Sequence, residues 1–442
     1  MSELSALSAC EALDAIGRRE ISAAELVQAC LDRIRAVEPR VEAWAFLDPE
    51  RALAQARDRD RMLADHTLLG PLHGLPVGIK DIFDTADMPT ENGTVLHAGR
   101  RPTEDATVVT LLRAAGAVIF GKTVTTELAV YGPGKTRNPH NPDHTPGGSS
   151  SGSAAAVAAE MVPLALGSQT NGSVIRPAAY CGVVGYKPSF GLIPRTGALR
   201  QSRPLDQVGV FARTVEDAAL LAHALMVFDE RDPDMRSQAQ PRFLEAAGQA
   251  PPSRPRLAFV RTPFWDQADR GARDIFAEFA IQSGEAEEVE LPSSFAEAAT
   301  IHRTIMEADF ATSFAAEYAR GKAMLTPTLR TMIERGQRTL AMDYRRAFEQ
   351  VPSLVRELEG IFARYDAILT PATTGEAPAG LASTGNPIFC TIWTLCGVPA
   401  ITLPLLRGPQ GLPLGVQLAG RRHDDARLLR TARWLSAQGA WR

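Results

Sequence analysis

Serine hydroxyls are concentrated in two glycine-rich stretches of this 442-residue chain. The run Gly147-Gly-Ser-Ser-Ser-Gly-Ser153 is followed, further along the chain, by Thr170-Asn-Gly-Ser173. Glycine and serine bury little apolar surface and are costly in entropy to order, so a folding core has no use for them in loops. Loops of this composition usually bind a ligand or carry out chemistry.

A serine hydroxyl is a poor nucleophile until a neighbouring base removes its proton, and a lysine can be that base when burial favours its neutral form. Lys80 is the candidate, because it ends the apolar run Leu75-Pro-Val-Gly-Ile79. This run predicts a buried strand that would leave the lysine stem buried beside its end. A solvated or ion-paired lysine is the alternative for a residue in this position.

Two familiar motifs occur in the sequence, and both are interpreted as false matches. Residues 116–123 fit the phosphate-binding pattern GxxxxGK[ST], but the variable positions are Ala, Val, Ile and Phe, which are typical of a strand rather than a loop. Residues 148–152 fit the nucleophile elbow GxSxG. The Pro-rich segment 138–146 cannot be the strand that an elbow requires before its serine.

Histidine and cysteine give no sign of a metal centre. His140 and His144 lie in a Pro-rich turn without an acidic or histidine partner at ligand spacing, so they are interpreted as surface residues. The five cysteines are scattered and show neither CxxC nor Cys/His ligand spacing, which favours small buried thiols. No metal and no other cofactor is expected.

The order of apolar patterns predicts an α/β protein. The segment 4–61 is helical in pattern and contains a capping box from Ser22 to Glu25. Short strand-like runs then alternate with helical ones, which implies a sheet sandwiched by helices. The expected strands are residues 75–79, 117–120, 183–186, 367–369, 400–405 and 414–418; the expected helices after the first segment are 106–115, 154–160, one capped at Thr214 to Asp217, and 424–435.

The late strands complete an early sheet, so the whole chain, residues 1–442, is expected to be one domain. Residues 1–62 are expected to form an N-terminal helical layer. Residues 229–365 are expected to be an insertion, with a polar, Pro-rich loop to about residue 256 and a helical lid from about residue 294. The pattern from Ser294 to Glu297 predicts a further capping box at the start of that lid.

Charge and targeting signals exclude several classes of partner. The formal net charge is -4, and no long Lys/Arg run is present, so neither nucleic acid nor an anionic membrane is an expected partner. The N-terminus lacks the layout of a secretory signal, and no apolar stretch has spanning length. These features favour a cytoplasmic protein with a small-molecule substrate, and they leave a homodimer open.

Three motifs together resemble the amidase signature family of Ser/cis-Ser/Lys hydrolases. They are Gly78-Ile-Lys80-Asp81, the loop from Gly147 to Gly152, and Gly172-Ser173, with 69 positions from Lys80 to Ser149 and 24 from Ser149 to Ser173. The resemblance covers nearly the whole chain, and the form Ser173-Val-Ile-Arg176-Pro is most similar to malonamidase-type bacterial amidases. It implies a single large domain in which helices cover both faces of a central mixed β-sheet.

The resemblance also implies a role for each motif residue. Ser173 would be the acylating nucleophile, Ser149 the bridging serine on a cis peptide bond after Gly148, and Lys80 the base that draws the proton through Ser149. The backbone N–H groups of Thr170, Asn171, Gly172 and Ser173 would form the oxyanion hole. Such donors contribute about 3 to 4 kcal/mol each in known acyl transfers.

Two departures from the family pattern fall close to the nucleophile. The family usually has an acid and a second glycine where this chain has Gln169 and Asn171, and asparagine tolerates left-handed backbone angles better than most residues. Arg176 stands three places beyond Ser173 rather than two. It would either bind a carboxylate or carbonyl of the substrate or form an ion pair with an acid such as Asp206.

Tyr131, Gly148 and Ser150 are further candidates for the substrate pocket, as is the segment around Ile392-Trp393, although aromatic core packing explains Tyr131 and Trp393 almost as well. The function expected from these residues is hydrolysis of a linear amide through an acyl-enzyme. Carbamates (urethanes) and esters share the same tetrahedral intermediate and are expected secondary substrates. A glutaminase subunit of a tRNA-dependent amidotransferase and a non-catalytic binding protein on the same fold are the alternatives.

Overall fold

An 11-stranded mixed sheet runs through the middle of the molecule in the order β1-β3-β2-β4-β6-β5-β10-β11-β9-β7-β8. The computed structural model describes residues 2–65, 70–237, 243–282 and 286–439. The strands are β1 (Trp44–Leu47), β2 (Pro76–Lys80), β3 (Val118–Thr123), β4 (Leu164–Gln169), β5 (Val184–Lys187), β6 (Gln207–Ala212), β7 (Leu257–Phe259), β8 (Ala286–Glu288), β9 (Ala367–Pro371), β10 (Ala400–Arg407) and β11 (Pro413–Ala419).

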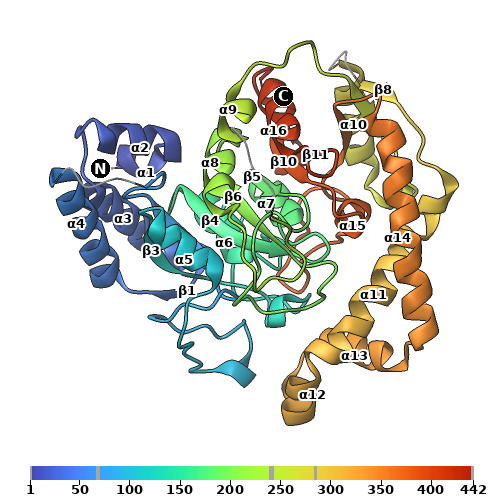
Figure 1. Cartoon of the computed structure of the whole chain (residues 1–442), viewed down its shortest axis with the longest axis horizontal. Coiled ribbons are helices and arrows are strands. Elements are labelled where there is room, and N and C mark those ends of the chain that lie inside the picture. The colour runs from blue at the N-terminus through green and yellow to red at the C-terminus, as the bar shows by residue number, and fades with distance from the viewer. Residues whose placement is uncertain (1, 66–69, 238–242, 283–285, 440–442) are drawn as a thin grey trace.

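Helices cover both faces of this sheet, and a column of helices stands at the β9-β7-β8 side of the molecule (Figure 1). The helices are α1 (Ser2–Ala6), α2 (Ala9–Gly17), α3 (Ala23–Val41), α4 (Pro49–Ala64), α5 (Thr107–Ala114), α6 (Ser151–Ala158), α7 (Ile175–Cys181), α8 (Val215–Leu225), α9 (Phe243–Gly248), α10 (Arg270–Gln282), α11 (Ala298–Ser313), α12 (Ala315–Gly321), α13 (Pro327–Arg338), α14 (Ala341–Phe362), α15 (Ile388–Leu395) and α16 (Asp425–Ser436).

The predicted α/β class and the predicted strands are confirmed. Early and late strands lie in the same sheet, because β5 pairs with β10 and β11 pairs with β9. The capping box at Ser22 and Glu25 is present at the start of α3. Gly121, Lys122 and Thr123 lie within β3, which confirms that the phosphate-binding pattern is a false match.

Other sequence-based expectations were incomplete or wrong. The N-terminal layer is not purely helical, since β1 forms the edge of the sheet and pairs antiparallel with β3. The segment 229–365 contains β7 and β8, which extend the sheet beyond β9. At Ser294 the chain forms a 3-10 turn, Ser293–Glu297, without a side-chain cap, so the predicted capping box is wrong.

The middle of the sheet brings the motif-bearing segments together. β2 runs parallel to both β3 and β4, and β4 pairs antiparallel with β6. Every residue of β2 and β3 is buried. Helices cover both faces of these strands, which explains why their sequences contain continuous apolar runs rather than an alternating pattern. The carboxyl ends of β2 and β4 therefore meet at one edge of the sheet, and Lys80 and Gln169 end these two strands.

The helices α11 to α14 form the predicted helical part of the insertion. α11 packs against α13, α14 and α15. Two contacts tie α12 to the loop before α5: His97 Nε2 lies 3.0 Å from Glu317 Oε1, and Arg320 donates to the carbonyl oxygen of Leu96. In the described part of the chain, no helix combines the length and the apolar character needed to cross a membrane.

Candidate active site

Lys80 lies at the buried end of β2, and its side chain has 0% exposure. Its Nζ atom is 2.7 Å from Ser149 Oγ and 2.8 Å from Ser168 Oγ. Both partners are neutral hydroxyls rather than carboxylates. The expectation that the lysine stem is buried beside the strand end is confirmed.

The surroundings of Lys80 favour a neutral amine. Burial lowers the pKa of Lys80 well below its usual value, and the charge of an ionised Asp206 acts in the opposite direction with a smaller effect. A neutral amine has a lone pair that can accept a proton, whereas an ammonium group has none. The lowered pKa therefore favours the form of Lys80 that could accept a proton from a neighbouring hydroxyl.

Ser149 follows a cis peptide bond after Gly148, as predicted from the family resemblance. The serine is buried, and its carbonyl oxygen accepts from the backbone N–H of Thr126. A Cβ atom at Gly148 would lie 2.8 Å from Thr384 Cγ2 and 2.9 Å from Thr126 Cγ2. Only glycine fits between these two threonines, so the loop can present Ser149 to Lys80.

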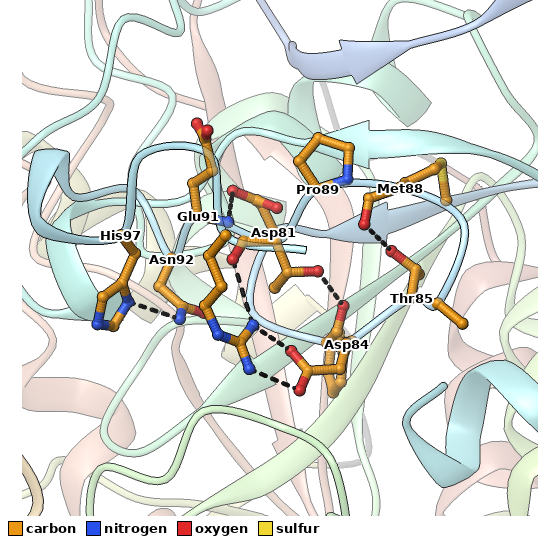
Figure 2. A network of polar contacts seen from close by, with 12 residues as sticks. Asp81, Asp84, Thr85, Met88, Pro89, Glu91, Asn92 and His97 are labelled. Carbon is orange, nitrogen blue, oxygen red and sulfur yellow. Dashed lines mark hydrogen bonds and ion pairs between the residues drawn. The ribbon is translucent and has the colours of Figure 1, made fainter. Parts of the chain in front are cut away.

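The chain that leaves Lys80 is fixed by a buried ion pair. Asp81 lies 3.1 Å from the Nζ atom of Lys122 on β3. It also accepts from the backbone N–H of Glu91, as Figure 2 shows. Arg100 makes two bonds to Asp84 in the same loop. Removing one partner of a buried pair typically costs about 3 to 5 kcal/mol, so this network holds the end of β2 in place.

Ser173 lies in the turn between β4 and α7 and is partly exposed. Within the described part of the chain, its hydroxyl makes no hydrogen bond, and the N–H groups of Asn171, Gly172 and Ser173 donate to no protein group. A Cβ atom at Gly172 would lie 2.9 Å from Pro387 Cβ and 3.1 Å from Cys390 Sγ. Pro387 and Cys390 therefore pack closely against one side of the turn, while the N–H groups of Asn171, Gly172 and Ser173 remain available to a ligand.

The side chain of Gln169 stabilises this turn through hydrogen bonds. Its Oε1 atom accepts from the backbone N–H groups of Val174 and Ile175 at 2.8 and 3.0 Å. Its Nε2 atom donates to Thr394 Oγ1, and Thr394 in turn donates to the carbonyl oxygen of Asn171. The neutral amide of Gln169 supports this chain of bonds, because its oxygen accepts while its nitrogen donates.

Asn171 and Thr170 are held by side chains from distant segments. Asn171 donates to the hydroxyl of Tyr131 and accepts from Thr391. His302 on α11 contacts the carbonyl oxygen of Thr170 through Nε2 at 2.9 Å. Burial lowers the pKa of His302 to about 4, so the ring is neutral near pH 7 and donates its Nε2 proton to that carbonyl.

Arg176 is 1% exposed and pairs with no carboxylate in the described part of the chain. Its Nη2 atom donates to the carbonyl oxygen of Gly148 at 2.7 Å and to Thr384 Oγ1 at 3.2 Å. Nε and Nη1 have no partner among the described residues. Asp206 bonds to other groups, so the expected alternative of an ion pair between Arg176 and Asp206 is wrong.

A cavity of about 570 Å³ opens between the turn and the helices of the insertion. Tyr131 and Asn171 line one side, and the guanidinium of Arg176 lies 5.8 Å from the ring centre of Tyr131. The other walls come from α11, α13 and the start of α15. Tyr131 therefore lines the cavity and lies beside the buried arginine, which does not itself line it.

The remaining candidates lie away from this cavity. Ser150 is fully buried, and its hydroxyl bonds to the backbone of Ser168, so its contacts are with the sheet. Trp393 is also fully buried within α15. His140 is exposed and contacts the carbonyl oxygen of Cys181, in agreement with its interpretation as a surface residue.

Ser168 was missed by sequence reasoning. It lies on β4, whose sequence Leu-Ala-Leu-Gly-Ser-Gln was not recognised as a strand, since alanine, glycine and serine weaken a strand pattern. The parallel pairing of β2 with β4, which brings Ser168 close to Lys80, is visible only in the structure. His302 and Thr394 were missed because only the fold brings them to the turn.

Comparisons with known proteins agree with this architecture. The Amidase family profile matches residues 25–429. The chain is 36% identical to a glutamyl-tRNA(Gln) amidotransferase subunit from Chloroflexus aggregans, over 97% of this chain and 96% of that protein.

Among solved structures, the peptide amidase of Stenotrophomonas maltophilia matches with a TM-score of 0.84 and 30% identity, over 98% of this chain and 96% of that one. A chain from a vestigial protein complex, described as revealing the evolutionary origins of an s-triazine catabolic enzyme, matches with a TM-score of 0.91 and 28% identity, over 99% of both chains. The buried lysine, the serine after a cis bond and the matching profile agree, and the chain belongs to the amidase family.

Proposed function

We propose that this protein hydrolyses linear amides through an acyl-enzyme, with Ser173 as nucleophile, Ser149 as the bridging serine and Lys80 as the base. The observation that carries the proposal is the contact of the buried Lys80 amine with Ser149. A desolvated, neutral lysine beside a hydroxyl is the arrangement that activates serine when no histidine is present.

Acylation begins when Lys80 takes the proton of Ser149 as Ser149 takes the proton of Ser173. The Ser173 oxygen then bonds to the amide carbon, and the carbonyl electrons move onto oxygen to form a tetrahedral intermediate. When these electrons return, the C–N bond breaks and the proton held by Lys80 passes through Ser149 to the leaving nitrogen. Ammonia or an amine leaves, and the acyl group stays on Ser173.

Deacylation repeats the transfer with water. A water molecule loses its proton through Ser149 to Lys80 as its oxygen bonds to the ester carbon. The bond to Ser173 then breaks, and the proton returns to the serine oxygen. The carboxylic acid product leaves, and all three residues are restored.

The free N–H groups of the turn are suited to the oxyanion. Donors at Asn171, Gly172 and Ser173 lack protein partners in the described residues, so they are available to the negative oxygen of the intermediate. Thr170, the first residue of the predicted oxyanion hole, has its carbonyl oxygen and its hydroxyl occupied by other contacts. These contacts hold the turn and do not involve its backbone N–H, which remains a proposed donor to the oxyanion.

Arg176 and the cavity suggest the kind of substrate. The two unpartnered nitrogens of Arg176 are suited to a carboxylate or a carbonyl of the substrate, with Gly148 and Tyr131 beside them. The cavity is large enough for a small-molecule acyl chain or leaving group. Carbamates and esters pass through the same intermediate and are proposed as secondary substrates.

The decisive experiment is active-site labelling. A fluorophosphonate probe should modify Ser173 in the wild type, as located by mass spectrometry of the labelled peptide, and S173A should not react. S294A is the matched control, because Ser294 is an exposed serine far along the chain. Modification at another serine, or amide turnover that survives in S173A, would contradict the proposal.

A second candidate function is the glutaminase subunit of a tRNA-dependent amidotransferase. The 36% identity to an amidotransferase subunit over nearly the full length favours it. The purified single chain should turn over simple amides if it is an independent amidase. Hydrolysis confined to glutamine, and only in the presence of partner subunits, would instead support the amidotransferase function.

The third alternative is a binding protein that has lost turnover. Gln169 and Asn171 depart from the usual motif, but the contacts of Gln169 form a complete set of bonds around the turn. Lys80, Ser149 and Ser173 are all present. The labelling experiment separates this alternative as well, because an inert site leaves Ser173 unmodified.

A further inference from the structure

The hydroxyl of Thr170 lies between two hydrogen-bond acceptors. Its Oγ1 atom is 2.5 Å from Gln201 Oε1 and 2.7 Å from Asp206 Oδ1. A threonine hydroxyl has one proton and can satisfy only one of them. The other short contact therefore needs a proton from the opposite partner.

Gln201 cannot supply that proton. Its Nε2 atom donates to the carbonyl oxygen of Leu128 at 2.9 Å, which fixes the orientation of the amide. A turned amide would place Oε1 against the Leu128 oxygen, and two acceptors would then face each other. The Thr170 proton is thus directed to Gln201.

Among the groups of the described residues that contact the Thr170 hydroxyl, the remaining source of this proton is the carboxyl group of Asp206. Its Oδ2 atom is occupied, because it accepts from the backbone N–H groups of Gln201 at 2.8 Å and Ser202 at 3.0 Å. Its Oδ1 atom faces Thr170. A proton on Oδ1 completes every bond in the cluster, with Asp206 donating to Thr170 and Thr170 donating to Gln201.

We infer that Asp206 works as a protonated carboxylic acid that donates to Thr170 and thereby positions the turn bearing Asn171, Gly172 and Ser173. This positioning role rests on the proposed function of that turn. Through Gln201 the same chain of bonds reaches Leu128, three residues before Tyr131. Asp206 thus connects the turn to the wall of the substrate cavity.

A neutral Asp206 is also compatible with a neutral Lys80, the proposed base. Asp206 and Ser168 line one cavity of about 370 Å³, and Ser168 contacts the Lys80 amine. An ionised carboxylate there would favour the ammonium form of Lys80, whereas a neutral acid does not. Both groups can therefore be neutral together, and Lys80 keeps the lone pair that it needs.

The titratable and charged groups around Asp206 belong to several elements. Those that line the same cavity or contact the residues bonded to Asp206 are Arg195, Arg200, Arg203, Arg231, Asp232, Asp234, His302 and Asp309. The Arg195 side chain is bound to Asp232 and Asp234 and reaches only the backbone carbonyl of Asp206. Burial raises the pKa of Asp206 to about 6, while its bonds to Thr170, Gln201 and Ser202 act to lower it.

The test compares two substitutions at this position. Asn in D206N retains a donor toward Thr170 and an acceptor for the two backbone N–H groups, so it mimics the protonated acid. D206A removes both. With a small amide as substrate, we expect kcat of D206A to fall by about tenfold or more and kcat of D206N to exceed that of D206A by about tenfold, with little change in KM.

The pH profile distinguishes a neutral acid from a carboxylate. If Asp206 is neutral in the working enzyme, the acid limb of kcat/KM has the same midpoint in wild type and D206N. If Asp206 is ionised, its removal lowers the pKa of Lys80 and moves the limb to lower pH, which would overturn the inference. D232N is the control, because it removes a charge from the same cavity without touching Thr170.

An infrared measurement tests the inference independently of turnover. The difference spectrum between wild type and D206N should contain the C=O band of a protonated carboxylic acid at the pH of fastest turnover, or below pH 6 if no amide is hydrolysed. A carboxylate band in its place would refute the inference even for an active enzyme. A protonated Asp206 in a protein without amidase activity would instead show that only the proposed function fails.

Discussion

The Nζ atom of Lys80 lies 2.7 Å from the Oγ atom of Ser149, although a long stretch of chain separates the two residues. β2 ends at the lysine, and the serine lies just before α6. Among the described residues, no other titratable side chain bonds to either functional group, and Ser168 is the second partner of the amine. The chemistry proposed for this pair therefore depends on the charge of one amine.

Replacing that amine should abolish most turnover. We expect K80A to lower kcat for amides by about 10²- to 10⁴-fold, the usual contribution of a positioned base. In the wild type, activity should fall toward acid pH, because the pKa of Lys80 is lowered by burial and only the neutral form accepts a proton. Steady-state rates across pH measure this, and a flat acid limb would contradict the role of Lys80.

The same burial should lower the free energy of unfolding near pH 7, because a lysine that is charged in the unfolded chain must lose its proton on folding. Its pKa is lower in the folded state than in the unfolded state, so the unfolded chain binds more protons and stability rises with pH toward the usual pKa of lysine. K80M should therefore unfold less readily than wild type near pH 7, by about 1 kcal/mol or more, with a difference that shrinks at alkaline pH.

Denaturant unfolding of K80M and wild type at several pH values checks this expectation. K135M is the control, because it replaces an exposed lysine by the same residue type and leaves the buried amine in place. A K80M variant less stable than wild type at every pH would show that the bonds to Ser149 and Ser168 outweigh the cost of burying the amine.

Ser168 should matter to the rate rather than to binding. Its hydroxyl is the second contact of the Lys80 amine and fixes the direction in which the lone pair points. We expect S168A to lower kcat by about tenfold with little change in KM, in proportion to one lost buried hydrogen bond. Steady-state kinetics measure both constants, and an unchanged kcat would show that Ser149 alone orients the amine.

Arg176 should discriminate between classes of substrate. Its unpartnered Nε and Nη1 atoms would pair with a substrate carboxylate, whereas its bond to Gly148 serves every substrate. R176A should therefore lower kcat/KM for amides that carry a carboxylate by about tenfold more than for neutral amides of equal length. Equal losses for both classes would assign Arg176 to holding the Gly148 loop.

Restoring the acid that the family usually carries should harm this protein. In Q169E the side chain still accepts from Val174 and Ile175, but it no longer donates to Thr394. Thr394 then has two acceptors for one proton, and the brace on Asn171 loosens. We expect kcat to fall by about tenfold, and a Q169E variant with higher activity would show that the glutamine is a tolerated defect.

The sequence was most informative where chemistry and strand pattern coincide. The burial of Lys80 at a strand end could be predicted because an apolar run ends at this residue. The functional importance of the Ser149 loop could be predicted because glycine and serine contribute little to a hydrophobic core. The brace around the turn could not be foreseen, since Gln169 meets Thr394 only through the fold. The same is true of His302, which comes from a helix far along the chain.

Local signals failed where tertiary contacts decide the outcome. The sequence at Ser294 has the letters of a capping box, but Pro292 begins a 3-10 turn and the Ser294 hydroxyl bonds to Glu357 on α14. β8 is a short edge strand with two glutamates, so it lacks an apolar pattern. A strand of this kind is stabilised by pairing with a neighbouring strand, here β7, rather than by its own sequence preference.

The bond from His302 to the carbonyl of Thr170 ties α11 to the turn that we propose as the oxyanion hole, and the same helix lines the cavity. If the proposed function holds, changing this helix to admit a new substrate would also shift the N–H donors of the turn. Substrate selectivity and turnover would then depend on the same contact. A new substrate preference introduced through this helix must therefore be followed by repair of the turn.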